Sequence, residues 1–182
     1  DRRRELNNTM STLHVENLKG PTSGANANKI IVPNGQTLAA PGHVVQVVQI
    51  QNSTEATITS GSHVDTGLSA SITPTSNTSK ILVIVTIHLR LQANASADSG
   101  AGWKLLRGTT ALRTTPTNYN NYVYGGSANG EFRGTESFSF LDSPATTSAT
   151  TYKVQGARYG SSIFKVQDNN TFSEMILMEI AQ

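Results

Sequence analysis

The sequence KILVIVTIHLRL, residues 80–91, constrains the fold of this chain more than any other segment. Its even-numbered positions change along the segment, from Leu82 and Ile84 to Thr86, His88 and Arg90. Its odd-numbered positions are all apolar: Ile81, Val83, Val85, Ile87, Leu89 and Leu91. Successive side chains of a β-strand point to opposite faces, so this pattern predicts a strand with one face buried throughout. The other face is expected to be buried at its start and exposed, or in an interface, at its end.

Other segments carry strand signals of the same kind. Residues 44–51 are rich in β-branched side chains, and alternation recurs in EFRGTESFSF (131–140), TTYKVQ (150–155) and TFSEMILMEIA (171–181). Clusters of Asn, Ser, Thr, Pro and Gly separate these segments and are typical of turns. Only 14% of the residues are charged, and the abundant Ser, Thr and Asn disfavour helices because they compete for backbone hydrogen bonds. The sequence therefore predicts an all-β fold, an antiparallel β-sandwich.

Two of the expected strands, 80–91 and 171–181, are apolar on nearly both faces. A single sandwich buries only one face of each strand. A second buried surface is therefore expected, and the simplest one is a neighbouring subunit of a homo-oligomer. A strand packed centrally within a monomer gives the same pattern, so the sequence leaves both possibilities open.

Residues 1–42 have a different composition from residues 43–182. Their apolar pieces are short and are interrupted by Pro and Gly, so this segment has too little to bury to fold alone. We expect it to anchor the chain by packing on a partner or on other copies of itself in an oligomer, and residues 43–182 to form the head domain. Arg2, Arg3 and Arg4 form the only basic cluster of the sequence, which is interpreted as a solvated basic end or as a contact with an acidic partner.

The remaining composition narrows the classes of function. The net charge is only +2, and the other basic residues are scattered, which argues against nucleic-acid binding. The chain has no cysteine and therefore no disulfide or thiolate metal site. No apolar run approaches the ~20 residues of a membrane helix, and the four histidines lack metal-ligand spacing. We expect no metal, no cofactor and no insertion into a membrane.

Catalytic residues are not expected either. A glycosidase needs two carboxylates that converge on one bond, and Glu131 and Glu136 lie five positions apart, so in one strand they point to opposite faces. The sequence contains no G-x-S-x-G elbow and no Gly-rich phosphate loop. The chain is therefore predicted not to be an enzyme.

The segment TPTNYNNYVYGGSANG, residues 115–130, is the best candidate for ligand binding. Tyrosine, asparagine, serine and glycine are typical of adaptable binding loops, and exposed aromatic rings stack on sugar rings. The alternative is that these tyrosines pack against a neighbouring subunit or cover the edge of the sandwich. The candidate ligand-binding residues are Tyr119, Asn120, Asn121, Tyr122 and Tyr124. Trp103, in contrast, is expected in a core or an interface.

Several phrases of the sequence resemble the head region of bacteriophage fibre proteins, particularly those of marine phages. In the head these are VDTGLSASITP (64–74), SNTSKILV (76–83), LLRGTTAL (105–112), LDSPATT (141–147) and MILMEI (175–180). The upstream phrases STLHVENL (11–18) and IVPNGQTL (31–38) look like the N-terminal stretch of the same proteins.

The resemblance implies a virion component on the surface of a capsid or tail. It also implies a homotrimer whose head is a jelly roll similar to tumour-necrosis-factor-like domains. The N-terminal segment would then attach to other virion proteins through Arg2, Arg3, Arg4, Leu13, Val15 and Leu18. Three functions follow as hypotheses. The first is a fibre or decoration protein, and the second is a receptor-binding module for host surface glycans that acts through residues 119–124. The third, an enzyme that degrades surface polysaccharide, has the least support.

Overall fold

The structure is a computed structural model, and it divides the chain into two units, Asp1–Ala39 and Ala40–Gln182. The described residues are 21–25, 27, 40–94, 97–117, 120–126, 130–160 and 163–182. In the first unit they form a turn in which the Ala27 N–H donates to the carbonyl of Gly24 at 3.1 Å. The six anchoring residues proposed from the sequence, and Tyr119, lie outside the described residues.

The second unit consists of two antiparallel sheets. Its described residues contain no α-helix and one 3-10 turn, η1 (Asp168–Asn170). Sheet A contains β1 (Val44–Asn52), β2 (Ala56–Thr57), β4 (Lys80–Gln92), β8 (Glu131–Asp142), β10 (Ile163–Val166) and β11 (Ser173–Ile180). Sheet B contains β3 (Val64–Ile72), β5 (Ser99–Arg107), β6 (Thr110–Thr114), β7 (Asn121–Val123) and β9 (Thr150–Tyr159).

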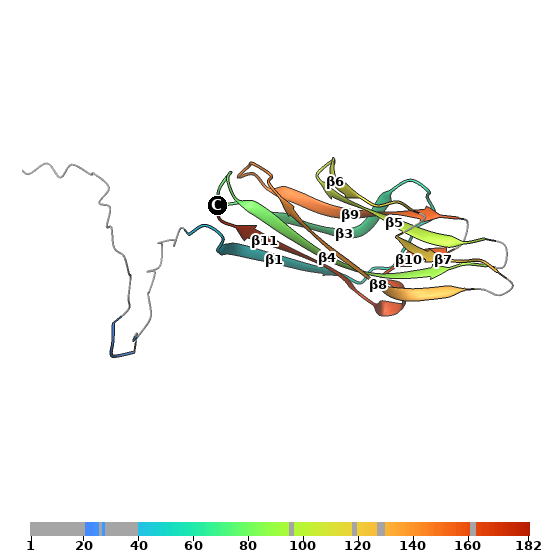
Figure 1. The fold of residues 1–182 in the computed structure, drawn as a ribbon, viewed down its shortest axis with the longest axis horizontal. Coiled ribbons are helices and arrows are strands. Elements are labelled where there is room, and N and C mark those ends of the chain that lie inside the picture. Colours follow the sequence, from blue (N-terminus) through green and yellow to red (C-terminus); the bar gives the residue numbers. More distant parts are fainter. Residues whose placement is uncertain are drawn as a thin grey trace, which may run out of the picture. The chain divides into compact units, whose positions relative to one another are not determined.

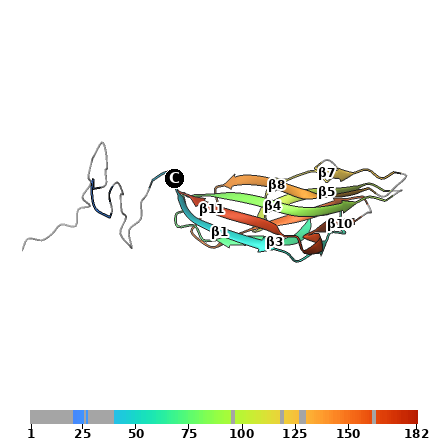
Figure 2. The same cartoon turned by 90° about the horizontal axis from the view of Figure 1, so that it is seen from below.

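The order of the strands is that of a jelly roll. Across sheet A the long strands run β1, β11, β4, β8, and across sheet B they run β3, β9, β5, β6. The chain changes sheet six times, after β2, β3, β4, β7, β8 and β9. Figures 1 and 2 show the two sheets stacked as a sandwich. The predicted all-β sandwich is confirmed, and its strand order matches the double-sheet jelly roll.

The core fills the space between the two sheets. The odd-numbered residues of β4 face inward and are fully buried, as their alternation predicts. Sheet B covers them with Leu105, Tyr152 and Val154, among others, and Trp103 packs edge-on against Phe164 with ring centroids 5.4 Å apart. A fully buried aliphatic or aromatic side chain stabilises a fold by about 1.5–3 kcal/mol. The sandwich therefore buries a core of its own, and Trp103 belongs to it.

The two ends of the sandwich differ in what they carry. At one end the chain enters and leaves: the Gly42 N–H donates to the Ala181 carbonyl at 2.8 Å, and the Ala181 N–H donates to the His43 carbonyl at 3.0 Å. We call this the terminal end; the loops 73–79 and 143–149 also lie there, because Lys80 pairs with Ile180 and Asp142 with Ile81. The opposite, distal end holds the described residues 93–94, 97–98, 115–117, 120, 124–126, 130 and 160. The sequence segments to which they belong, 93–98, 115–120, 124–130 and 160–162, are called the four distal loops.

Candidate functional sites

Three tyrosines meet at the distal end, on the outer face of sheet B. In the register of this sheet Gly100 of β5 lies between Tyr122 of β7 and Tyr159 of β9. The ring centroids of Tyr122 and Tyr159 are 5.7 Å apart, and Tyr124 meets Tyr122 edge-on at 4.9 Å. A Cβ atom at position 100 would lie 3.1 Å from the Tyr122 ring and 3.2 Å from the Cβ of Tyr159. The glycine thus leaves the space that the two rings occupy.

Asp98 fixes this tyrosine cluster. The Tyr122 hydroxyl donates a hydrogen bond to Oδ2 of Asp98, and the Gly125 N–H donates to Oδ1 at 2.6 Å. The hydrogen bond to Asp98 raises the pKa of Tyr122 to about 12, and the hydrogen bonds from Tyr122 and Gly125 lower the pKa of Asp98. At neutral pH the carboxylate is therefore ionised and the phenol keeps its proton. Tyr122 is held in place, while Tyr124 is 79% exposed.

The loops around the cluster have an unusual composition. In the four distal loops, 93–98, 115–120, 124–130 and 160–162, Asp98 is the single charged residue, and Asn, Ser, Gly, Ala and Thr make up most of the rest. Both aromatic residues of these loops are tyrosines. This composition is typical of binding loops, in which tyrosine supplies contact area and small polar residues supply hydrogen bonds.

The structure brings together two of the five candidate residues and separates a third from them. Tyr122 and Tyr124 share the outer cluster, whereas Asn121 points to the opposite face of β7. There the Trp103 Nε1–H donates to its Oδ1 at 2.9 Å, and its Nδ2 donates to Glu136 at 3.1 Å. The Asn120 amide donates to the same Oδ1 at 3.2 Å. The side chain of Asn121 therefore hydrogen-bonds Trp103 and Glu136 between the sheets and does not belong to the outer tyrosine cluster.

Two residues of the cluster were not found from the sequence, Asp98 and Tyr159. Asp98 lies 24 positions before Tyr122 along the chain, and Tyr159 belongs to a different strand of sheet B. Only the pairing of β5 with both β7 and β9 brings them together. No local spacing in the sequence signals that pairing.

Glu131 and Glu136 lie on opposite faces of β8, as predicted. Glu131 pairs in register with Gln92 and contacts Arg90 and Arg133 on the outer face, whereas Glu136 lies opposite the buried Ile87. The two carboxylates do not converge on one bond. Among the described residues no group of three or more His, Asp or Glu side chains is placed to hold a metal ion.

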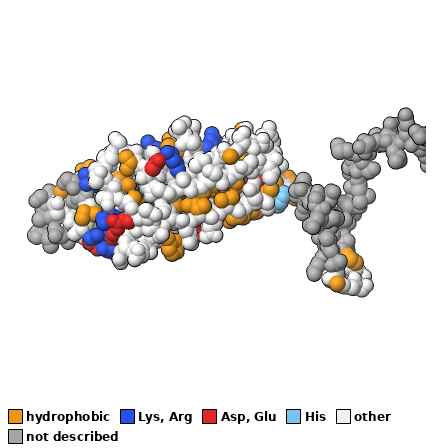
Figure 3. All heavy atoms as spheres, turned by 180° about the vertical axis from the view of Figure 1, so that it is seen from behind, with side chains coloured by type: hydrophobic (Ala, Val, Ile, Leu, Met, Phe, Trp, Pro, Cys, Tyr) orange, Lys and Arg blue, Asp and Glu red, His pale blue; other side chains and the backbone are white. Residues whose placement is uncertain are grey.

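The outer face of sheet A is apolar toward the terminal end. One row across the strands consists of Val47, Met178, Leu82 and Leu141, and the next row contains Ile176 and Ile84. These six residues are called the apolar face below. Val47 and Leu141 are 55% and 52% exposed, and the other four are partly exposed. On the side shown in Figure 3, hydrophobic side chains gather toward the C-terminal end of the sandwich.

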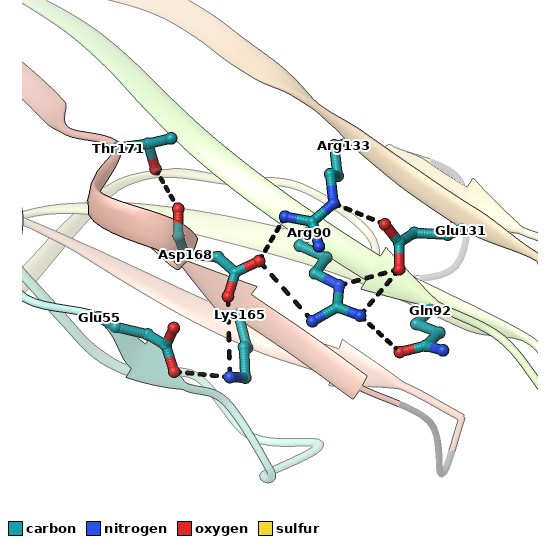
Figure 4. A network of polar contacts seen from close by, with 8 residues as sticks. All are labelled: Glu55, Arg90, Gln92, Glu131, Arg133, Lys165, Asp168 and Thr171. Carbon is teal, nitrogen blue, oxygen red and sulfur yellow. Dashed lines mark hydrogen bonds and ion pairs between the residues drawn. The ribbon is translucent and has the colours of Figure 1, made fainter.

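The same face of sheet A is charged toward the distal end. Arg90 of β4 contacts Glu131 at 2.8 Å, and Arg133 of β8 contacts Asp168 at 2.6 Å (Figure 4). Lys165 of β10 joins the network through Glu55 at 2.6 Å and Asp168 at 3.7 Å. Three basic and three acidic side chains thus neutralise one another. This network explains why the outward side of β4 changes from Leu82 and Ile84 to Arg90.

The fold defines a jelly-roll protein, and comparisons with known proteins add distant similarities. Neither a protein-family model nor a curated protein matches the chain. None of the helices in the described part of the chain is long and apolar enough to span a membrane.

Among solved structures, the chain is similar to the VP2 subviral particle of infectious bursal disease virus, with 12% identity and a TM-score of 0.39 over 89% of this chain and 46% of that chain. VP2 of the same virus in T=1 particles gives 14% identity and a TM-score of 0.40, over 88% of this chain and 44% of that one. Dimeric latent PorU from Porphyromonas gingivalis gives 9% identity and a TM-score of 0.35, over 85% of this chain and 15% of that chain. The chain thus spans less than half the length of these VP2 chains. At these identities and TM-scores the similarities assign no function to it.

Proposed function

We propose that this chain is a structural protein of a bacteriophage virion, a homotrimeric fibre or decoration protein displayed on the capsid or tail. The observation that carries the proposal is the polarity of the head. The chain enters and leaves at the terminal end, and the tyrosine-bearing loops lie at the distal end. A head attached through residues 1–42 then presents its binding-type loops away from the particle. The resemblance of several sequence segments to phage fibre heads favours the same role.

Self-association is proposed through the apolar face of sheet A. The core of the sandwich is complete without these six residues, because the inner faces of both sheets already bury one another. A contiguous apolar surface that the core does not use is typical of a protein–protein interface. In a homotrimer it would be covered by neighbouring copies, which gives the outward apolar residues of β4 and β11 a reason to be there.

Light scattering of the purified full chain tests the homotrimer. We expect the mass of a trimer at micromolar concentration, and a monomer when Val47→Lys and Leu141→Lys are combined. Both side chains are more than half exposed, so the core is not disturbed, and circular dichroism should stay unchanged. Thr135→Lys is the matched control, since Thr135 is exposed on the outward side of β8 beyond the apolar face. A monomeric parent chain, or a trimer that tolerates the double substitution, contradicts the proposal.

Attachment through the N-terminal segment is tested on assembled particles. Replacing Leu13, Val15 and Leu18 by Asp should abolish incorporation into the particle, because the apolar contacts proposed for these residues would be lost. The trimer itself should persist in light scattering. Immunogold labelling of intact particles then distinguishes a capsid location from a tail location, and labelling of neither excludes a virion role.

A second function is favoured by the exposed ring of Tyr124 beside the fixed ring of Tyr122. We propose that the head contacts a receptor on the host surface through this cluster. Tyr122→Ala and Tyr124→Ala together should reduce adsorption of particles to host cells, with particle number and trimer mass unchanged. Unchanged adsorption leaves only the structural role.

A further inference from the structure

We propose that the tyrosine cluster binds neutral sugar rings and rejects acidic ones, with Tyr124 and Tyr159 as its stacking surfaces and Asp98 as its selectivity residue. The inference rests on the proposed receptor-binding role and names its ligand class. It adds Tyr159 and Asp98 to the site and removes Asn121 from it.

The first argument is the prepared aromatic surface. Tyr124 is 79% exposed and Tyr159 is 40% exposed, and both rings contact the ring of Tyr122 between them. Tyr122 is in turn fixed by Asp98. Two exposed rings braced by a third lose little conformational freedom on binding, so the entropic penalty of binding is small. A flat pyranose ring with C–H groups on one face fits such rings better than a branched apolar side chain does.

The second argument is charge. No Lys or Arg occurs in the four distal loops, and Asp98, with its lowered pKa, is ionised at neutral pH. A carboxylate-bearing sugar would meet this charge in a partly dehydrated site without a basic partner from the loops, which disfavours it. Hydroxyl groups, by contrast, can donate hydrogen bonds to the ionised carboxylate of Asp98 and exchange them with the phenol hydroxyls of Tyr124 and Tyr159. The site therefore suits neutral, hydroxyl-rich ligands.

The third argument separates the cluster from the self-association surface. The tyrosines lie on the outer face of sheet B, and the apolar face lies on the outer face of sheet A. The tyrosines are therefore not part of the apolar face, and an interface that buries the apolar face does not need their rings.

The test measures binding of the full chain to immobilised oligosaccharides. One arm carries neutral hexose and N-acetylhexosamine glycans, and the other carries sialylated and uronic-acid glycans. We expect binding to members of the neutral arm only. Tyr124→Ala and Tyr159→Ala should each weaken it about tenfold, equivalent to about 1.4 kcal/mol. Phe172→Ala is the matched control, because Phe172 is an aromatic residue that is 56% exposed outside the cluster, and it should bind like the parent chain.

Asp98→Asn tests the selectivity residue. The amide keeps an oxygen that accepts from Tyr122 or Gly125, and acidic glycans should gain affinity relative to neutral ones. Three results would each overturn the inference: preference of the parent chain for acidic glycans, no binding to any glycan, or Tyr124→Ala and Tyr159→Ala variants that bind neutral glycans as tightly as the parent chain does. Adsorption to host cells separates this failure from failure of the proposed function: if the tyrosine variants lose adsorption but no glycan binds, the receptor is of another class.

Discussion

Glu179 shows how a single buried carboxylate organises the terminal end. Its side chain is fully buried on β11. It accepts hydrogen bonds from Gln46 Nε2 at 2.6 Å and from the backbone N–H and the hydroxyl of Thr75, both at 2.8 Å. Burial alone would raise the pKa of Glu179, but hydrogen bonds from Gln46, Ser79 and Thr75 outweigh it and lower the pKa to about 2. The carboxylate therefore ties β1, β11 and the loop 73–79 together.

This hydrogen bonding makes stability depend on pH. The pKa of Glu179 is about 2 in the folded chain and 4.5 for a free side chain. The ionised form is thus favoured by folding, and its contribution, on the order of 3 kcal/mol, is complete above pH 4.5. It is lost as the pH falls from 4.5 to 2. Urea denaturation across this range should show the loss, and Glu179→Gln should remove its part of the pH dependence. If the free energy of unfolding of Glu179→Gln depends on pH in the same way as that of the parent chain, Glu179 is not the group responsible.

Asp142 joins the two sheets near the same end. The Tyr152 hydroxyl donates to its carboxylate at 2.7 Å, and Arg107 Nη1 donates to both of its oxygens at 2.8–2.9 Å. Asp142→Ala should destabilise the fold by about 3 kcal/mol, because it leaves a buried hydroxyl and a cation without their acceptor. Tyr152→Phe should cost only about 1 kcal/mol.

A double-mutant cycle by chemical denaturation checks this coupling. The two changes together should destabilise the fold by less than the sum of the single changes, since each removes the same hydrogen bond. Strict additivity would show that the two groups do not interact.

At the level of elements, strand length decides what the sequence can predict. β4 covers 13 residues, enough for the alternation of Ile81 to Leu91 to show both its burial and its outward change of polarity. β7 covers three residues, and no alternation was visible around it. Its faces are set by pairing with β5, which sends Tyr122 outward and Asn121 inward. The sandwich was therefore predictable from local pattern, and the tyrosine cluster depended on long-range pairing.

β5 offers a test of that pairing. A Cβ atom at position 100 would lie 2.7 Å from the carbonyl oxygen of Thr117 and close to both tyrosines. Gly100→Ala should therefore displace the loop 115–120 and lower the melting temperature, since overpacking of this kind costs about 1–3 kcal/mol. Gly126→Ala, where a Cβ atom meets nothing within 4 Å, should melt like the parent chain. Equal melting temperatures for Gly100→Ala and Gly126→Ala would contradict the close approach of Thr117 to position 100.

The sandwich as a whole is elongated along its strands and has two distinct ends (Figure 1). β4 alone, with 13 residues, spans roughly 40 Å at about 3.3 Å per residue. Because the chain has no cysteine, spin labels can be placed singly at Gly126 and Gln182, at the distal and terminal ends. Pulsed electron resonance of labelled chains diluted into unlabelled ones should give a distance of roughly 40 Å. Labels at Thr147 and Gln182 should be much closer, and similar distances for the two pairs would contradict the polarity.

The hydrogen bonds between Gly42 and Ala181, and between Ala181 and His43, have a consequence for how such heads change over time. Since the first and last strands of the jelly roll meet at one place, a domain exchanged at this end of the sandwich is replaced as one piece, without interrupting a strand. Variation in the length and sequence of the distal loops is then separated from the end at which the chain enters. Under the proposed virion role, a particle would change its receptor specificity without a change in the way the head is attached.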